Sequence, residues 1–297
     1  MYYWIIFAAA LLFCIVGFKE FVWFMSVGYG LSVCGIGIAN LAILLISFFS
    51  GNPILGINPI TDPVVYYVLI AQSVIFIGYG IRLGGFLLIR ELKNAAYKKT
   101  LQEAAGAEPP IFVKVVMWFL MGALYLAQTA GLNYKVHNFK GGIVLPIIGI
   151  AISLLGVIIE ATADKQKGAQ KKADPNMVAT KGLFKFVRCP NYFGEVTFWT
   201  GTFISGLSSY HGFGQWFVAI LGYICIVYIM FNGCQRLDKR QSLRLAGNPE
   251  FEEYATKTPI LIPFIPWYYH MDAKEAIKES KMAHAKKLAK EFEAQGK

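Results

Sequence analysis

The residues of this chain best suited to chemistry are ionisable side chains set within long apolar stretches. An ionisable side chain at membrane depth costs on the order of 2–3 kcal/mol on insertion scales, so it usually faces a cavity or a partner. Three clusters of this kind occur, at 79–90, 160–167 and 182–201. Their tyrosines, arginines, carboxylates and amide suit the binding of a polar cofactor and the donation of a proton.

The cluster at 182–201 has the sequence GLFKFVRCPNYFGEVTFWTG. Pro190 is well placed to start a helix, which puts Asn191 and Glu195 on one face of its first turns. Arg188 precedes this helix, and the glycine before Glu195 lets another group approach closely. An arginine, an amide and a carboxylate at a helix entry form a suitable site for a cofactor with phosphates. Capping of the helix alone is the competing interpretation.

The cluster at 160–167 pairs two carboxylates, because Glu160 and Asp164 are one helical turn apart and Lys167 follows. Two carboxylates this close repel each other unless a cation or a hydrogen-bond donor lies between them. Water and the neighbouring lysines at a frayed membrane boundary supply such donors in one interpretation. A ligand with ribose hydroxyls or an amide group supplies them in the other.

The cluster at 79–90 belongs to an apolar segment with the sequence IGYGIRLGGFLLIREL. At 100° per residue, Tyr79, Arg82 and Arg90 fall within about 80° of one another on a helix. Arg90 alone is consistent with a side chain that reaches the membrane boundary. Arg82 lies two turns deeper, so we expect a functional partner for it. Four glycines allow a backbone or a flat ligand to approach this segment: Gly78, Gly80, Gly84 and Gly85.

The elements that position these clusters are membrane-spanning helices. Mean hydropathy is +0.49, 56% of the residues are hydrophobic and 15% are charged, which excludes an ordinary soluble domain. Apolar stretches long enough to cross the bilayer predict an all-α polytopic membrane protein with about seven transmembrane helices. The predicted spans are 2–18, 26–49, 63–89, 111–131, 143–162, 191–209 and 213–233. The first is interpreted as a retained helix, because no basic residue precedes it and no signal-peptide cleavage site ends it.

The distribution of the net charge of +10 predicts the topology. Lysines and arginines follow the odd-numbered spans, whereas the connection 50–62 has none and 132–142 has only Lys135 and Lys140. The positive-inside rule then places the N-terminus outside and the C-terminus in the cytoplasm. The basic excess is explained by topology and by anionic lipid, so the predicted partner is the bilayer and not nucleic acid.

The predicted organisation is one integral membrane domain over 1–270, followed by a charged, helical cytoplasmic tail at 271–297. Within the domain, the second half at 143–267 carries the cofactor site. The five cysteines show no metal-ligand spacing, so no metal is expected.

The stretch 182–201 resembles the signature of the steroid 5-alpha-reductase C-terminal family, including its bacterial members of unassigned function. That family has GLW-x-YSRHPNYFGE where this chain has GLFKFVRCPNYFGE, with Cys189 at a position where histidine is frequent. Upstream, EATADKQKG resembles the acidic pair of the family, and GNPEFEEYATKTPILIPFIPW resembles its C-terminal segment. More weakly, YGIR at 79–82 resembles the tyrosine-x-x-arginine of the substrate helix of the steroid reductases.

The resemblance implies a seven-helix membrane reductase in which NADPH enters from the cytoplasm and passes hydride to a carbon–carbon double bond. The substrate class is a steroid, sterol or other hydrophobic, enone-like lipid. By the resemblance, the nicotinamide end is held by Asn191, Tyr192 and Glu195, and the ribose or amide groups are held by Glu160 and Asp164. The phosphates and adenosine meet Lys181, Arg188 and Tyr254, and Arg82 closes the pocket. The membrane is that of the endoplasmic reticulum in a eukaryote and the inner membrane in a bacterium.

Tyr79 is the implied catalytic acid, a phenol that polarises the enone oxygen with Arg82 as the nearest cation. Steroid reductases pair this tyrosine with a glutamate on an earlier helix. This chain has no acidic residue between Glu20 and Asp62, so its cavity is expected to take a different lipid or an alkene that needs no such pair.

Two alternatives stay open at this point. Isoprenylcysteine carboxyl methyltransferases of the same superfamily use a similar R-x-P-x-Y-x-G motif to bind S-adenosylmethionine, which has no phosphates. The lysines at 165–188 and the asparagine of PNYFGE favour the reductase. A non-catalytic membrane scaffold with the same fold is the other alternative, and the sequence leaves substrate, compartment and oligomeric state open.

Overall fold

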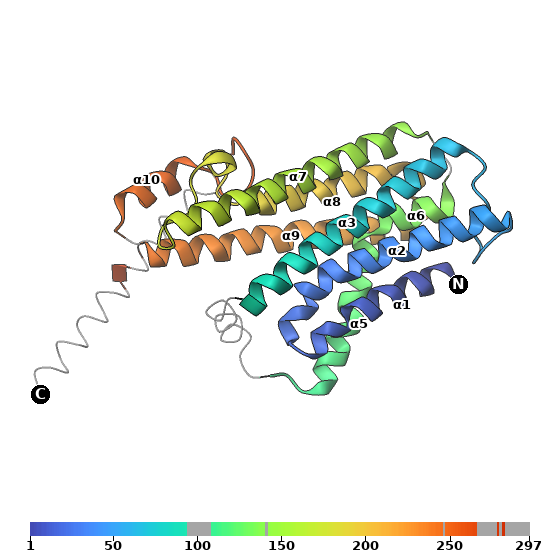
Figure 1. Cartoon of the computed structure of the whole chain (residues 1–297), viewed down its shortest axis with the longest axis horizontal. Coiled ribbons are helices and arrows are strands. Elements are labelled where there is room, and N and C mark those ends of the chain that lie inside the picture. The colour runs from blue at the N-terminus through green and yellow to red at the C-terminus, as the bar shows by residue number, and fades with distance from the viewer. Residues whose placement is uncertain (94–107, 140–141, 246, 266–277, 279–280, 283–297) are drawn as a thin grey trace, which may run out of the picture. The chain divides into compact units, whose positions relative to one another are not determined.

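The computed structural model describes residues 1–93, 108–139, 142–245, 247–265, 278 and 281–282. These residues form helices and short 3₁₀ turns, with one isolated antiparallel bridge between Ile54 and Ile57 (Figure 1). The α-helices are α1 (Tyr2–Cys14), α2 (Val27–Ser50), α3 (Pro63–Lys93), α5 (Ile111–Gln128), α6 (Ala130–Asn138), α7 (Val144–Ala173), α8 (Pro190–Gly206), α9 (Gly212–Arg244) and α10 (Pro249–Lys257).

Each of the seven apolar segments contains a helix, so the predicted all-α, polytopic membrane protein is confirmed. Five candidate spans are long and apolar enough to cross a bilayer: Phe21–Ser50, Pro63–Lys93, Ile111–Gln128, Val144–Ala173 and Gly212–Arg244. The apolar helix at Tyr2–Phe18 and the 17-residue α8 are shorter. The count of seven and the orientation in the membrane stay predictions.

Two features differ from the predicted elements, and a third prediction is not tested. The connection after the fourth span holds a further helix, α6, so Lys135 is a fully buried helical residue and not a loop residue. The last span does not end at 233, because α9 continues to Arg244. The predicted tail lies outside the described residues apart from 278, 281 and 282, as do Lys98, Lys99 and Lys140.

The chain divides into two compact units by its internal contacts. Unit 1 comprises 1–154 and 199–225, and unit 2 comprises 155–198 and 226–297. The boundaries fall inside helices α7, α8 and α9, each of which contributes residues to both units. The prediction of one domain over 1–270 therefore stays a prediction.

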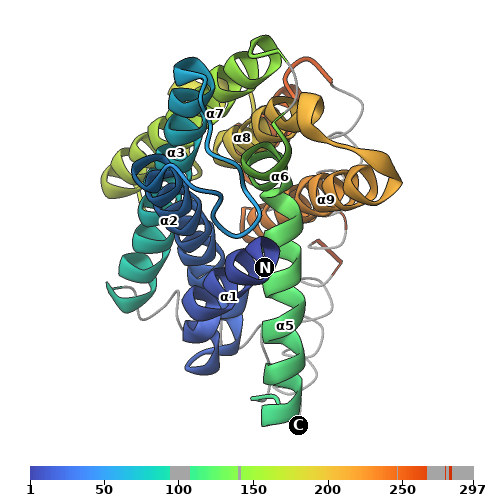
Figure 2. The ribbon, with the colours of Figure 1, turned by 90° about the vertical axis from the view of Figure 1, so that its right-hand side faces the viewer.

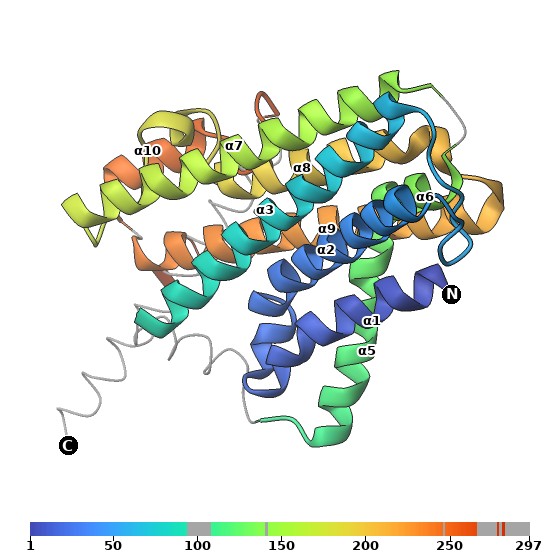
Figure 3. The ribbon, with the colours of Figure 1, turned by 45° about the vertical axis from the view of Figure 1, so that its right-hand side comes forward.

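Unit 1 is built around the pairing of α2 with α3, which run side by side (Figures 1 and 3). Glycines bring the two backbones into direct contact. A Cβ atom on Gly80 would lie 2.4 Å from the carbonyl oxygen of Gly30, and one on Gly30 would lie 2.5 Å from the amide nitrogen of Gly84. Small residues at a helix interface are what allow such an approach in a membrane protein. Helix α1 packs against both α2 and α5 in the same unit (Figure 2).

Two networks of polar groups are buried in unit 1. In the first, the Tyr2 hydroxyl donates to Asn40 Oδ1 at 2.5 Å, and Asn40 Nδ2 donates to Asn133 Oδ1 at 3.0 Å. In the second, the Lys135 ammonium or amine donates to Gln72 Oε1, and Gln72 Nε2 donates to Ser205 Oγ at 2.8 Å. Burial lowers the pKa of Lys135 from 10.5 to about 7.

Unit 2 contains a second glycine contact, between α7 and α8. A Cβ atom on Gly156 would lie 2.4 Å from the amide nitrogen of Phe198, and one on Gly194 would lie 2.7 Å from that of Glu160. The two helices therefore pack backbone against backbone at the turns that carry the predicted carboxylates.

Candidate functional site

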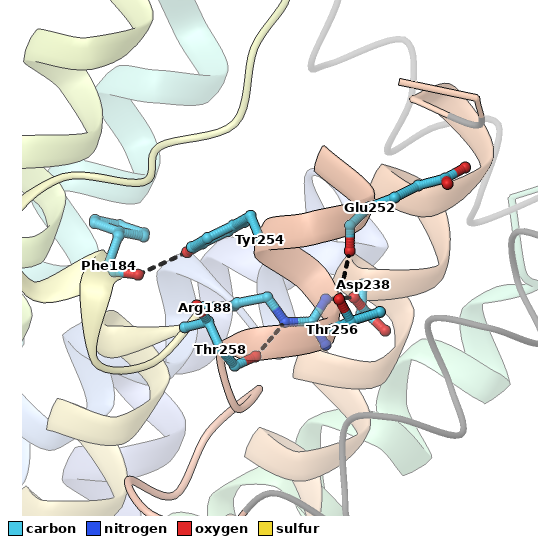
Figure 4. Close-up of polar contacts among 7 residues, drawn as sticks. All are labelled: Phe184, Arg188, Asp238, Glu252, Tyr254, Thr256 and Thr258. Carbon is cyan, nitrogen blue, oxygen red and sulfur yellow. Dashed lines mark hydrogen bonds and ion pairs between the residues drawn. The ribbon is translucent and has the colours of Figure 1, made fainter. Parts of the chain in front are cut away.

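The entry to α8 is anchored by a buried ion pair. The Arg188 guanidinium pairs with the Asp238 carboxylate of α9, and each side chain is only 2% exposed. Arg188 Nε also donates to the carbonyl oxygen of Thr258 at 3.1 Å (Figure 4). The backbone amides of Arg188 and Cys189 donate to the carbonyls of Pro259 and Ile260 at 2.8 and 2.9 Å. Side chain and backbone together hold this turn against the segment that follows α10.

Helix α10 braces the same turn from another side. The Tyr254 hydroxyl donates to the carbonyl oxygen of Phe184 at 2.7 Å, as Figure 4 shows. Burial raises the pKa of Tyr254 well above its usual value, so the hydroxyl keeps its proton as a donor. The helix begins at Pro249 and is capped by Asn248, whose Oδ1 accepts from the amide of Phe251 at 3.0 Å.

Helix α7 supplies a third support through two glutamines. Gln170 Oε1 accepts from the amides of Thr180 and Lys181, both at 2.9 Å, and Gln166 Oε1 accepts from the amide of Leu183 at 2.8 Å. Between them Gly182 has φ +70°, a conformation that favours glycine, and a Cβ atom there would lie 2.3 Å from Gln166 Oε1. The loop from 180 to 190 is thus positioned by side chains of α7, α9 and α10.

The predicted carboxylates of α7 and α8 lie in the interior of unit 2. Glu160 is 3% exposed and Glu195 is 7% exposed. Because Gly194 packs on the Glu160 backbone, the first turns of α8 meet the polar turn of α7. Asn191 and Glu195 fall within about 100° of Gly194 around the helix, on the same side of this contact. The structure therefore brings these two predicted clusters together.

The other predicted cofactor residues of unit 2 occupy more open positions. Asp164 and Tyr192 are half-buried, and the Lys181 side chain is exposed. The Tyr192 ring lies beside α9, where a Cβ atom on Gly233 would be 3.1 Å from it. Arg188 and Tyr254 are committed to Asp238 and Phe184 and so position the loop.

Tyr79 and Arg82 belong to unit 1. Tyr79 is 1% exposed, and its hydroxyl lies 3.2 Å from that of Tyr29 on α2. Trp199 of α8 donates from its indole N–H to the Tyr29 oxygen at 2.5 Å, and its ring meets the Tyr79 ring edge to face at 6.1 Å. Arg82 is half-buried one turn further along α3.

Sequence reasoning missed Asp238, both glutamines of α7, Tyr29 and Trp199. Buried residues recur every four positions through and past the predicted end of the last span at 233: Met230, Cys234, Asp238 and Ser242. That spacing indicates one continuous helical face. Tyr29 and Trp199 gave no comparable signal, since aromatic residues in apolar helices are ordinarily packing residues.

Among the described residues, no group of three or more histidines, cysteines, aspartates or glutamates is arranged to hold a metal ion.

Comparison with known proteins places these features in a family. The model of a family described as "Protein of unknown function (DUF1295)" matches residues 65–258, well over half of the chain. Steroid 5-alpha-reductase DET2 of Gossypium hirsutum is 26% identical over 122 residues, which cover 40% of this chain and 42% of that protein. The 3-oxo-5-alpha-steroid 4-dehydrogenase 1 of Macaca fascicularis is 27% identical over 121 residues, covering 40% and 41%.

The chain thus spans about two fifths of the length of these curated relatives. No solved structure matches it. The predicted resemblance to the steroid 5-alpha-reductases is confirmed at the level of the family. This chain belongs to the DUF1295 family, and two fifths of it is similar to steroid 5-alpha-reductases.

Proposed function

We propose that this protein is a membrane-embedded, NADPH-dependent reductase that reduces a carbon–carbon double bond conjugated with a carbonyl in a hydrophobic, lipid-like substrate. The observation that carries the proposal is the pair of buried carboxylates, Glu160 and Glu195, on packed faces of α7 and α8. Both lie inside the segment matched by the family, whose relatives are named as reductases and dehydrogenases of steroids. Carboxylates inside apolar helices are costly, so their placement supports a functional role.

The residues of unit 2 fit the polar groups of such a cofactor. Asn191 Oδ1 is buried and accepts no hydrogen bond from the described residues, so it suits the amide NH₂ of a nicotinamide. We assign Tyr192 and Glu195 to the same end of the cofactor, and Glu160 and Asp164 to its ribose or amide groups. Carboxylates are acceptors only, which matches the hydroxyl and amide donors of the ligand.

The phosphates and the adenosine are assigned to the loop before α8. Lys181 is exposed and carries a charge suited to phosphate. Arg188 and Tyr254 hold the backbone of this loop through Asp238 and Phe184, and we place both at the same end of the cofactor. Their hydrogen bonds preorganise the loop before the ligand arrives.

Tyr79 is assigned as the acid that acts on the substrate, with Arg82 closing the pocket from the same helix. When bound, the cofactor supplies a hydride. A hydrogen bond from the Tyr79 hydroxyl to the substrate carbonyl oxygen draws electrons from the β-carbon and so prepares it for attack. The α-carbon takes a proton from solvent, which completes the reduction of the double bond.

The identity of the cofactor tests the proposal most directly. The full-length protein in lipid nanodiscs is heated with NADPH or with S-adenosylmethionine. NADPH at 100 times its dissociation constant is expected to add about 2.7 kcal/mol to the free energy of unfolding. Stabilisation by S-adenosylmethionine alone indicates a methyltransferase, and stabilisation by neither ligand indicates a scaffold; both results contradict the proposal.

A single substitution at the start of α8 tests whether NADPH binds there. Asn191→Ala is expected to weaken NADPH binding by about 1–3 kcal/mol, because a buried polar partner of the ligand is lost. Asn52→Ala, in an exposed loop of unit 1, is the matched control and should leave NADPH affinity unchanged.

A further inference from the structure

Tyr29 of α2 is a buried residue to which no role has so far been assigned. It is 6% exposed, and its hydroxyl has two aromatic neighbours within hydrogen-bond distance. Trp199 Nε1–H donates to it at 2.5 Å, and the Tyr79 hydroxyl lies 3.2 Å away. All three residues belong to unit 1, on α2, α3 and α8.

The positions of Tyr29 and Tyr79 are fixed by the backbones on which they stand. Each is followed directly by a glycine, Gly30 and Gly80, and these two glycines form the closest contact between α2 and α3. A Cβ atom on Gly80 would also lie 2.5 Å from the amide nitrogen of Cys34. The two phenols are therefore presented to each other by rigid helices in backbone contact, and not by mobile loops.

The donor inventory settles one of the two hydrogen bonds. An indole N–H is a donor only, so the Tyr29 oxygen accepts from Trp199. The Tyr29 and Tyr79 hydroxyls lie 3.2 Å apart, and either can donate to the other. When Tyr29 donates, the proton of Tyr79 is directed to an acceptor other than Tyr29.

We infer that Tyr29 is a positioning residue that donates to Tyr79, so that the Tyr79 hydroxyl is aimed at the substrate carbonyl oxygen. The inference rests on the proposed function, in which Tyr79 acts on the substrate. The hydrogen bond from Tyr29 also stabilises the negative charge that grows on the Tyr79 oxygen as its proton is drawn toward the substrate. Trp199 anchors the Tyr29 hydroxyl by donating to its oxygen.

The hydrogen bond itself is tested without turnover. 3-Fluorotyrosine is placed at position 79 of the full-length protein in nanodiscs, and its ¹⁹F resonance is recorded. Tyr29→Phe should shift this resonance, because the donor to the Tyr79 oxygen is lost. Tyr66→Phe is the matched control, a buried tyrosine of the same helix that stacks on Phe48 with 4.7 Å between ring centroids. An unchanged resonance in Tyr29→Phe, with the protein still folded by thermal melting, overturns the inference.

The positioning role is tested by kinetics with NADPH and progesterone, a 3-keto-4-ene steroid, as the probe substrate. Tyr29→Phe should lower kcat about tenfold, the loss of one hydrogen bond, while KM changes less than twofold. Trp199→Phe, which keeps an aromatic ring, should lower kcat in the same direction by a few-fold. The double variant Tyr29→Phe/Tyr79→Phe should be no slower than Tyr79→Phe alone, because Tyr29 acts only through Tyr79.

The kinetic and ¹⁹F measurements distinguish a failure of the Tyr29 role from a failure of the proposed function. Additive losses in the double variant contradict a role of Tyr29 through Tyr79, even if the enzyme reduces the steroid. If progesterone is not reduced, 3-keto-4-ene steroids are excluded as substrates, and the ¹⁹F shift alone decides whether Tyr29 holds Tyr79.

Discussion

The two units of this protein bury polar groups in different ways. The interior of unit 1 holds phenols, amides and an indole joined by hydrogen bonds, as in the Tyr29–Tyr79 and Asn40–Asn133 pairs. The interior of unit 2 holds carboxylates, with an arginine paired to one of them in Arg188–Asp238. Neutral groups need only a hydrogen-bond partner when they leave water, whereas ions also need an opposite charge or several donors.

This difference matches the two kinds of ligand that the proposed reaction requires. An apolar substrate with one carbonyl oxygen is served by a single hydroxyl donor in an uncharged interior. A cofactor with an amide, ribose hydroxyls and phosphates is served by carboxylates and cations. Three buried ionisable side chains of unit 1 depart from this pattern: Glu91, Lys114 and the fully buried Lys135.

The largest expected effect is on the unfolding free energy, when the buried ion pair of unit 2 is broken. Asp238→Ala leaves the Arg188 charge buried, and the loss of one partner of a buried pair typically costs about 3–5 kcal/mol of unfolding free energy. Denaturant unfolding in nanodiscs measures it. Glu253→Gln, which removes the exposed pair of Glu253 with Lys257 on α10, is the control and should change nothing measurable. A wild-type stability for Asp238→Ala would mean that the pair does not hold the turn before α8.

The next largest effect is expected on the rate of hydride transfer, when the Tyr79 hydroxyl is removed from unit 1. Tyr79→Phe removes only the hydroxyl and keeps the ring against Trp199, so we expect NADPH to bind as before while hydride transfer slows by roughly 100-fold or more. Single-turnover kinetics and NADPH titration measure the two quantities separately. Unchanged turnover in this variant would mean that Tyr79 serves only in packing.

A smaller effect concerns the glycine contact that holds the two phenols. Gly80→Ala forces α2 and α3 apart and should destabilise the protein by about 1–3 kcal/mol, because the added Cβ atom meets backbone. Gly78→Ala is the matched control on the same helix, since its Cβ atom would meet nothing within 4 Å. Alanine there should be neutral or stabilising through helix propensity. Equal melting temperatures for the two variants would contradict the tight α2–α3 contact.

The smallest expected effect, per pH unit, is a pH dependence of the unfolding free energy that is due to Lys135. Its folded pKa of about 7 lies below its usual 10.5, so between these values the unfolded state binds the proton and the native state releases it. Stability should therefore rise with pH across this window, by at most about 1.4 kcal/mol per pH unit, and be lost as pH falls toward 7. Unfolding at pH 7, 8 and 9 measures the slope relative to Lys135→Met, which lacks the titrating group. Identical slopes in the two proteins would show that Lys135 is charged in the fold.

The sequence alone determined the class of the protein and the location of the helices in its seven apolar segments. Apolar length decides membrane insertion, and Pro190 with its flanking residues predicts the start of α8 at the position where the structure has it. The clustering of Glu160 with the first turns of α8 was anticipated, because both carboxylates lie in apolar helices where ions require partners.

Only the tertiary structure decided which distant residues meet. Tyr29 and Tyr79 are separated by 50 residues, as are Arg188 and Asp238, and Lys135 bonds to Gln72 across 63. A tyrosine in an apolar helix looks like ordinary packing, and Asp238 lies beyond the predicted end of the last span at 233. Their partners depend on which helix faces come together, and in unit 1 the backbone contact of Gly30 with Gly80 and Gly84 sets that choice for α2 and α3.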